Sequence, residues 1–131
     1  MTDSPTSPGG AGAIVPAVLD PVALDKLREL DPDGRRRVVQ RVLTAFESSL
    51  ARWLAQLEAQ RGDSQPATVS SIAHTLKSSA GSVGAKDLAQ ACADLERRLR
   101  AGDTAELTGD IERLLRLGHS ALAAIRAMLH P

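Results

Sequence analysis

Aromatic residues, cysteine and a surplus of either charge are nearly or wholly missing from this sequence. Its 131 residues include no tyrosine, one phenylalanine (Phe46) and one tryptophan (Trp53). The core must therefore be built from aliphatic side chains, which favours packed helices over a sheet. Lysine plus arginine and aspartate plus glutamate number 16 each. With neither a basic surplus nor rings for base stacking, nucleic acid is excluded as the expected partner.

A single cysteine, Cys92, excludes an intramolecular disulfide and a cysteine-based metal cluster. No stretch reads as a signal peptide or as an apolar span of about 18 residues. We therefore expect a cytoplasmic protein without a membrane partner. Cys92 falls on an apolar helical stripe, where packing is its expected role.

The chain is long enough for one domain, with a tail before it. Residues 1–19 are rich in Pro, Gly, Ser and Ala and lack a helical period, which predicts a flexible tail or linker. From there on, apolar residues recur every three or four positions, which predicts a short helix capped by Asp20 over 21–30 and longer helices at about 34–61, 66–83, 85–101 and 104–129. Short turns between these helices predict an all-α fold, an antiparallel four-helix bundle over residues 20–131 with a short extra N-terminal helix.

A helical wheel of the segment around His74 separates a core side from an open side. At about 100° per residue, the side opposite His74 carries the bulky apolar residues Val69, Ile72, Leu76 and Val83. The side that His74 shares carries Lys77 and the small residues Ala67, Ser70, Ser78 and Gly81. The imidazole should therefore face solvent above a floor of small side chains, which leaves it open to another macromolecule.

Residues 73–100, AHTLKSSAGSVGAKDLAQACADLERRLR, resemble the signature of histidine-containing phosphotransfer (HPt) domains of bacterial multistep phosphorelays. That pattern runs roughly AHxLKGSSxxxGAxxLxxxCxxLE, and the residues at its spacing are His74, Leu76, Lys77, Gly84, Ala85, Leu88, Cys92, Leu95 and Glu96. Ser78 stands where the family often has glycine, and serine is still small. The flanking helices fit the family's bundle over about residues 20–130.

The resemblance implies a phosphocarrier. His74 would accept a phosphoryl group on its distal nitrogen from the aspartyl phosphate of one receiver domain and pass it to the aspartate of another. Lys77, one turn away, would stabilise the phosphate. Glu96 and Arg100 occupy positions that lie beside the phosphorylated histidine in some relatives, where they would contact the ring or the phosphate.

The expected partners are response-regulator receiver domains and a hybrid sensor histidine kinase, with this chain a monomer. No nucleotide-binding loop or metal-ligand cluster is evident, so we expect no intrinsic cofactor, no metal site and no independent catalytic activity. Mg²⁺ would be bound by the receiver.

Two alternatives stay open from the sequence. The bundle could be an interaction module that binds a receiver or kinase without carrying phosphate, or the phospho-accepting domain of a chemotaxis-type kinase. The pairing of His74 with Lys77 favours the phosphocarrier. His119 and His130 have no comparable surroundings, and we expect both to be solvated. Arg97 and Arg98 form, with Arg100, a charged run that is either a solvated face or a means of steering a receiver.

Overall fold

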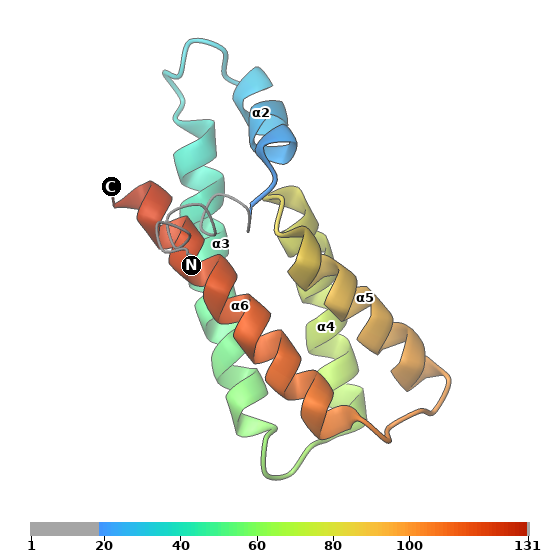
Figure 1. The fold of residues 1–131 in the computed structure, drawn as a ribbon. Coiled ribbons are helices and arrows are strands. Elements are labelled where there is room, and N and C mark those ends of the chain that lie inside the picture. Colours follow the sequence, from blue (N-terminus) through green and yellow to red (C-terminus); the bar gives the residue numbers. More distant parts are fainter. Residues whose placement is uncertain (1–18, 131) are drawn as a thin grey trace, which may run out of the picture.

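Five α-helices make up the part of the chain that the structure describes. The computed structural model describes residues 19–130 (Figure 1). Its helices are α2 (Pro21–Glu29), α3 (Val38–Ala59), α4 (Pro66–Ser82), α5 (Lys86–Arg100) and α6 (Leu107–Leu129). Residues 19–130 contain no strand, and none of their helices is long and apolar enough to span a membrane. The predicted all-α class is confirmed.

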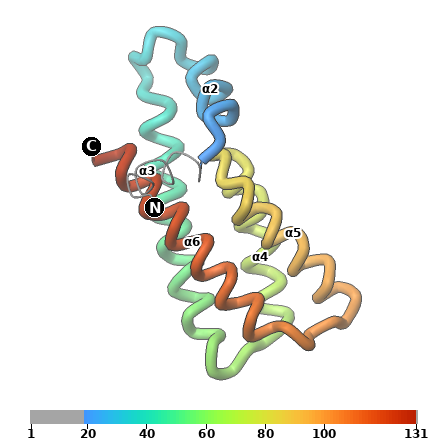
Figure 2. The backbone as a smooth tube through the Cα atoms, in the orientation of Figure 1, coloured from blue at the N-terminus to red at the C-terminus, as the bar shows by residue number. Residues whose placement is uncertain are grey.

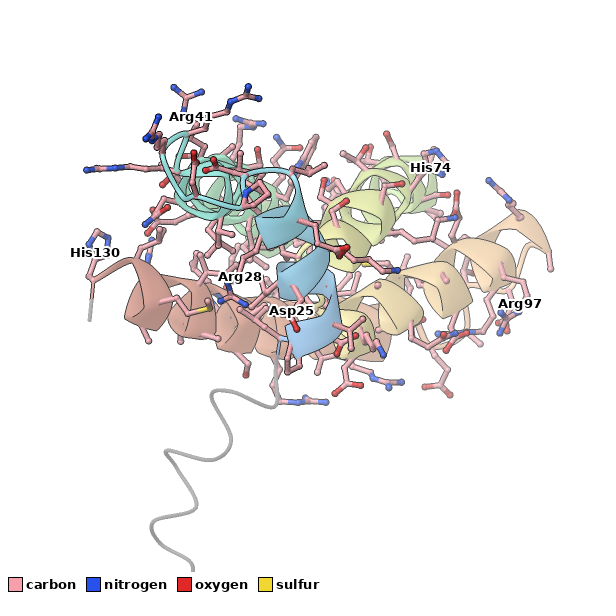
Figure 3. All side chains as sticks on the ribbon, turned by 90° about the horizontal axis from the view of Figure 1, so that it is seen from above. Asp25, Arg28, Arg41, His74, Arg97 and His130 are labelled. Atoms are coloured by element: carbon pink, nitrogen blue, oxygen red, sulfur yellow. The ribbon has the colours of Figure 1, made fainter. Side chains whose placement is uncertain are left out.

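The four longer helices form an antiparallel bundle, as predicted. α4 packs most extensively on α5, and α3 on α6, while contacts of α5 with α6 and of α3 with α4 close the ring. Seen down the bundle, α3 and α4 form one layer and α5 and α6 the other (Figure 3). The short helix α2 extends beyond the bundle end and contacts α3 (Figures 1 and 2). The outer surface of the α3–α4 layer is therefore free of any other described helix.

The core follows from the spacing of apolar residues. On α3 the buried residues recur every three or four positions, so that they line one side of the helix: Leu43, Phe46, Leu50, Leu54 and Leu57. α6 carries a matching row, and its Gly118 lets the two helices approach closely. A Cβ atom added at Gly118 would overlap the side chain of Leu54. Aliphatic packing thus replaces the aromatic residues that the sequence lacks.

Two helix starts differ from the prediction. α3 begins at Val38 rather than near Gly34, because Gly34 (φ 73°) and Arg37 (φ 52°) adopt left-handed conformations that cannot continue a right-handed helix. The backbone N–H of Val38 instead donates to Asp31 Oδ2 at 3.4 Å. α6 begins at Leu107 rather than at residue 104, because the N–H of Ala105 donates to the side chain of Asp103 and holds a turn there.

The start of the bundle is fixed by contacts around Asp20. The Asp20 side chain accepts from the N–H of Val22 at 3.2 Å and so caps α2, as predicted. Its own N–H donates to the Gly84 carbonyl at 2.7 Å. Leu19, which we assigned to the tail, is buried in the core, so the boundary at residue 19 is wrong by at least that residue. The rest of the predicted tail, residues 1–18, lies outside the described residues.

Gly84 forms the turn that reverses the chain between α4 and α5. Its φ is +80°, a region that residues with a side chain rarely adopt. A Cβ atom at this position would lie 2.6 Å from the backbone nitrogen of Asp20 and 2.8 Å from its carbonyl oxygen. Two independent constraints, the left-handed backbone and the close approach of Asp20, therefore require glycine here.

We expect Gly84→Ala to destabilise the bundle by about 1–3 kcal/mol, because the methyl group meets backbone atoms and the residue must keep a positive φ. Gly81→Ala is the matched control, since nothing lies within 4 Å of a Cβ atom at that position of α4. It should leave stability unchanged or slightly raised. Urea unfolding measures both variants, and equal losses would contradict the constraint at Gly84.

Candidate functional site

His74 lies on the outer side of α4, facing away from the core. The four apolar residues predicted opposite it, Val69, Ile72, Leu76 and Val83, are all buried. The His74 side chain is 62% exposed, and Figure 3 shows it on the outer surface of the α3–α4 layer. The orientation that the helical wheel predicted is confirmed.

A buried carboxylate from the neighbouring helix lies directly behind His74. Glu96 of α5 has a side chain only 4% exposed, yet both of its oxygens are bonded. Oε2 lies 2.6 Å from His74 Nδ1 and 2.7 Å from Arg100 Nη2, and Oε1 lies 2.7 Å from Lys77 Nζ. One carboxylate therefore joins an imidazole, an ammonium and a guanidinium from two helices.

These three partners keep Glu96 ionised. The hydrogen bond that Lys77 donates lowers the pKa of Glu96 below its usual value; burial opposes this, but the hydrogen bond from His74 and the charge of Arg100 act in the same direction as Lys77. An ionised carboxylate can only accept hydrogen bonds. The short contact to His74 therefore requires the proton to be on Nδ1.

The position of this proton determines the chemistry of the ring. A neutral imidazole carries one N–H and one nitrogen with a free lone pair. With Nδ1–H donating to Glu96, the lone pair is on Nε2, the ring nitrogen farther from the backbone. The site thus presents a nucleophilic nitrogen on an exposed side chain, oriented by a buried acceptor.

The other residues predicted for the site lie around His74 as follows. Lys77 is half-buried and Arg100 is exposed, and both donate to Glu96. Of the predicted floor, Ala67, Ser78 and Gly81 are exposed, whereas Ser70 is half-buried. The structure therefore leaves small residues open on both sides of His74 along α4, with Ser70 more covered than the others.

The other histidines, Cys92 and the arginines beside Arg100 lie elsewhere or form contacts of their own. His119 and His130 are exposed. Cys92 is buried, and this burial raises the pKa of its thiol to about 12, which disfavours the reactive thiolate. In the run beside Arg100, Arg97 pairs with Asp94 and Arg98 forms a two-bond ion pair with Asp110 of α6. Within residues 19–130 no group of three or more potential ligands could hold a metal ion.

Sequence reasoning assigned Glu96 a contact with the ring or the phosphate but missed that it lies at the centre of the site. A signal was present, since Glu96 follows Cys92 by four residues and Leu95 by one, on the stripe that α5 buries. A carboxylate on a buried stripe needs charged or hydrogen-bonded partners. The sequence does not show that His74 and Lys77 are those partners, because they belong to another helix.

Together, the fold and the site define a helical bundle that presents one oriented nucleophilic histidine on an open surface. Comparison with known protein families matches residues 41–130 to the Hpt domain model. The chain belongs to the Hpt domain family, and histidine phosphotransfer in two-component signalling is its function class. A comparison with curated protein sequences gives no match.

The fold is also similar to a solved structure. The crystal structure of histidine-containing phosphotransfer protein B (HptB) from Pseudomonas aeruginosa PAO1 matches with a TM-score of 0.73 and 23% sequence identity. The match covers 86% of this chain and 94% of that one. At this identity the likeness establishes the shared fold.

The lowered pKa of Glu96 makes a prediction about acid stability. A carboxyl group whose pKa is lower in the folded than in the unfolded chain stabilises the fold above its unfolded pKa, about 4.3, and loses that contribution as the pH falls through the folded value. We therefore expect the parent to lose stability relative to Glu96→Gln as the pH is lowered from 6 towards 3. Urea midpoints across this range measure the difference.

The control for this experiment is Glu29→Gln, which removes an exposed carboxylate of α2 that forms no ion pair with a residue of 19–130. Relative to this variant the parent should show little change over the same pH range. If the two glutamine variants follow the same pH profile, Glu96 is not held ionised by its partners.

Proposed function

We propose that this chain is a phosphorelay intermediate that takes a phosphoryl group from the aspartyl phosphate of one receiver domain onto His74 and delivers it to the aspartate of another. The observation that carries the proposal is the pairing of an exposed His74 with the buried Glu96, which directs the Nε2 lone pair outward. Membership of the Hpt family supports the same chemistry. Exchange with receivers and a hybrid sensor kinase would take place in the cytoplasm.

The transfer step follows from the proton on Nδ1. The Nε2 lone pair attacks the phosphorus, the bond between phosphorus and the aspartyl oxygen breaks, and the electron pair leaves with the receiver carboxylate. The Nδ1 proton stays in place, so the ring becomes positively charged beside the ionised Glu96. Glu96 thus stabilises charge that develops in the transition state, without itself taking a proton. The reverse step returns the phosphoryl group to a second aspartate.

Lys77 and Arg100 supply positive charge next to the transferred group. Both donate to Glu96. Lys77 lies one turn after His74 on α4, and Arg100 lies one turn after Glu96 on α5. A phosphoryl group on Nε2 carries a charge of about −2, and this charge competes with Glu96 for the Lys77 ammonium. We assign Lys77 to phosphate stabilisation and Glu96 to orienting the ring. Mg²⁺ would come with the receiver, whose carboxylates are its preferred ligands.

The open surface around His74 fits a protein partner rather than a small molecule. Ser78 and Gly81 are exposed and small, so a receiver surface can approach the ring closely. In-line transfer requires the reacting atoms to come within about 3–3.5 Å, which leaves little tolerance for bulk on this surface. We propose that Ala67, Ser70, Ser78 and Gly81 form the floor of the docking site.

Transfer of labelled phosphate tests the function. A panel of purified receiver domains is first phosphorylated with acetyl phosphate and Mg²⁺ and is then mixed with the protein. The parent should gain label that is labile in acid and stable in base, as phosphohistidine is. His74→Gln should gain none and remain folded, because Lys77 and Arg100 still donate to Glu96.

His119→Gln, an exposed histidine on α6, is the matched control and should label like the parent. Acid-stable label, or label that persists in His74→Gln, would place the phosphate on another residue. Binding of a receiver to the parent without any transfer would make the bundle an interaction module instead.

The docking floor makes a second prediction. Ser78→Arg keeps a residue suited to an exposed helix, so stability should change little, but its bulk would hold the receiver back from His74. We expect transfer to slow at least tenfold, which corresponds to about 1.4 kcal/mol in the barrier. Ser78→Gly should transfer at the parent rate despite some weakening of the helix. Rapid-quench kinetics with a receiver from the panel measure the transfer rates. An equal rate for Ser78→Arg and the parent would contradict the proposed docking floor.

A further inference from the structure

A group of arginines surrounds the start of α3, away from the histidine site. Arg35, Arg36, Arg37 and Arg41 are all exposed and line one shallow surface depression with Gln40 and Thr44. Arg35 pairs with Asp33 at 3.5 Å, but no carboxylate of residues 19–130 lies within ion-pair distance of the other three. These four residues are called the arginine cluster below.

The cluster is part of a wider separation of charge in a chain whose net charge is zero. α4 contains no acidic residue. α3 contains two, Glu47 and Glu58, and each is paired with an arginine, Arg126 and Arg61. The other acidic residues of the bundle proper are on α5, on α6 and in the loop between them, apart from Asp63 in the loop between α3 and α4. The outer face of the α3–α4 layer is therefore basic, and it is the face that presents His74 (Figure 3).

The positive charge of the cluster is only partly compensated within the fold. The first turn of α3 holds no acidic residue, although the N-terminal end of a helix carries a partial positive charge that favours acidic side chains. Asp31 accepts from the N–H of Val38 and Asp33 pairs with Arg35, so two carboxylates compensate part of this positive charge, whereas Arg36, Arg37 and Arg41 have no ion-pair partner within residues 19–130. A partner that carries the opposite charge would compensate the remainder.

The distance from His74 places the cluster at the edge of a docking footprint. Arg41 lies at the start of α3 and His74 near the middle of the antiparallel α4, which separates them by about 15 Å along the bundle and about 10 Å across it. A standard interface buries about 800 Å² on each partner, a patch about 16 Å in radius. The direct separation is therefore about 18 Å, so Arg41 lies just beyond the edge of a footprint centred on His74 and the other three arginines lie farther out, where their long side chains and their charge still act on a docked protein.

We propose that the arginine cluster is a second contact surface for the receiver domain and selects receivers whose surface beside the phosphoacceptor pocket is acidic. The inference rests on the proposed function only in naming a receiver as the partner. A receiver that binds Mg²⁺ gathers carboxylates at its transfer face, so its charge complements this surface. Charges at an interface rim mainly accelerate association and make it depend on salt.

The test uses the double variant Arg36→Gln/Arg41→Gln and a receiver from the labelling panel, with association followed by stopped-flow at 20 to 300 mM salt. We expect the association rate constant at low salt to fall about three- to tenfold and its dependence on salt to flatten. Phosphoryl transfer within the formed complex should keep the parent rate. The melting temperature should stay the same or rise.

Arg113→Gln/Arg116→Gln is the matched control, because it removes the same charge from exposed arginines of α6 in the opposite layer. It should associate nearly as fast as the parent. Equal rates for the two double variants would overturn the proposal. It would also be overturned if Arg36→Gln/Arg41→Gln left receiver association unchanged but abolished binding to phosphatidylserine vesicles, since the cluster would then serve a membrane surface.

The two proposals fail separately. If the arginine variant slows association with a receiver that never labels His74, the docking surface stands and the relay function does not. If label reaches His74 at the same rate from every receiver regardless of the arginines and of salt, the relay stands and the second contact surface does not.

Discussion

The buried carboxylate of Glu96 is the interaction on which the rest of the site depends. An ionised group with 4% of its side chain exposed is tolerated only when charged or hydrogen-bonding partners replace its lost hydration. The partners are His74, Lys77 and Arg100, and the hydrogen bond to Glu96 holds each of these side chains in place. One buried charge thus determines the tautomer of the imidazole and holds the two cations that a phosphoryl group needs. The hydrogen bonds that stabilise the buried carboxylate are therefore the ones that orient the nucleophile.

The close packing of α4 on α5 makes this arrangement possible. The carboxylate reaches the imidazole only because the two helices lie side by side in one register. That register is set at the turn, where Gly84 takes a positive φ and its carbonyl accepts from the N–H of Asp20. The small residues that leave His74 open outward lie on the opposite side of α4 from the leucine and isoleucine that bind it to the core. A single amphipathic helix therefore serves both the fold and the docking surface.

Helix positions could be read from the sequence because aliphatic residues repeat at the period of a helix, and four of the five helices were expected within a few residues of their observed starts. The starts that were wrong lie where backbone conformation overrides periodicity. Arg37 is left-handed at φ 52°, although arginine gives no sign of this in a sequence. The burial of Leu19 was missed because it follows from the docking of this segment on the bundle, where the N–H of the next residue, Asp20, donates to the distant Gly84.

The sequence by itself determined that His74 points outward with Lys77 beside it and the apolar residues behind, because all of these lie on one helix whose geometry is local. It also carried the family pattern, since that pattern spans consecutive residues. Only the tertiary structure decided that Glu96 joins His74, Lys77 and Arg100, and that the arginine cluster shares a face with His74. Both depend on how separate helices are placed, and that placement results from packing the whole core rather than from any one segment.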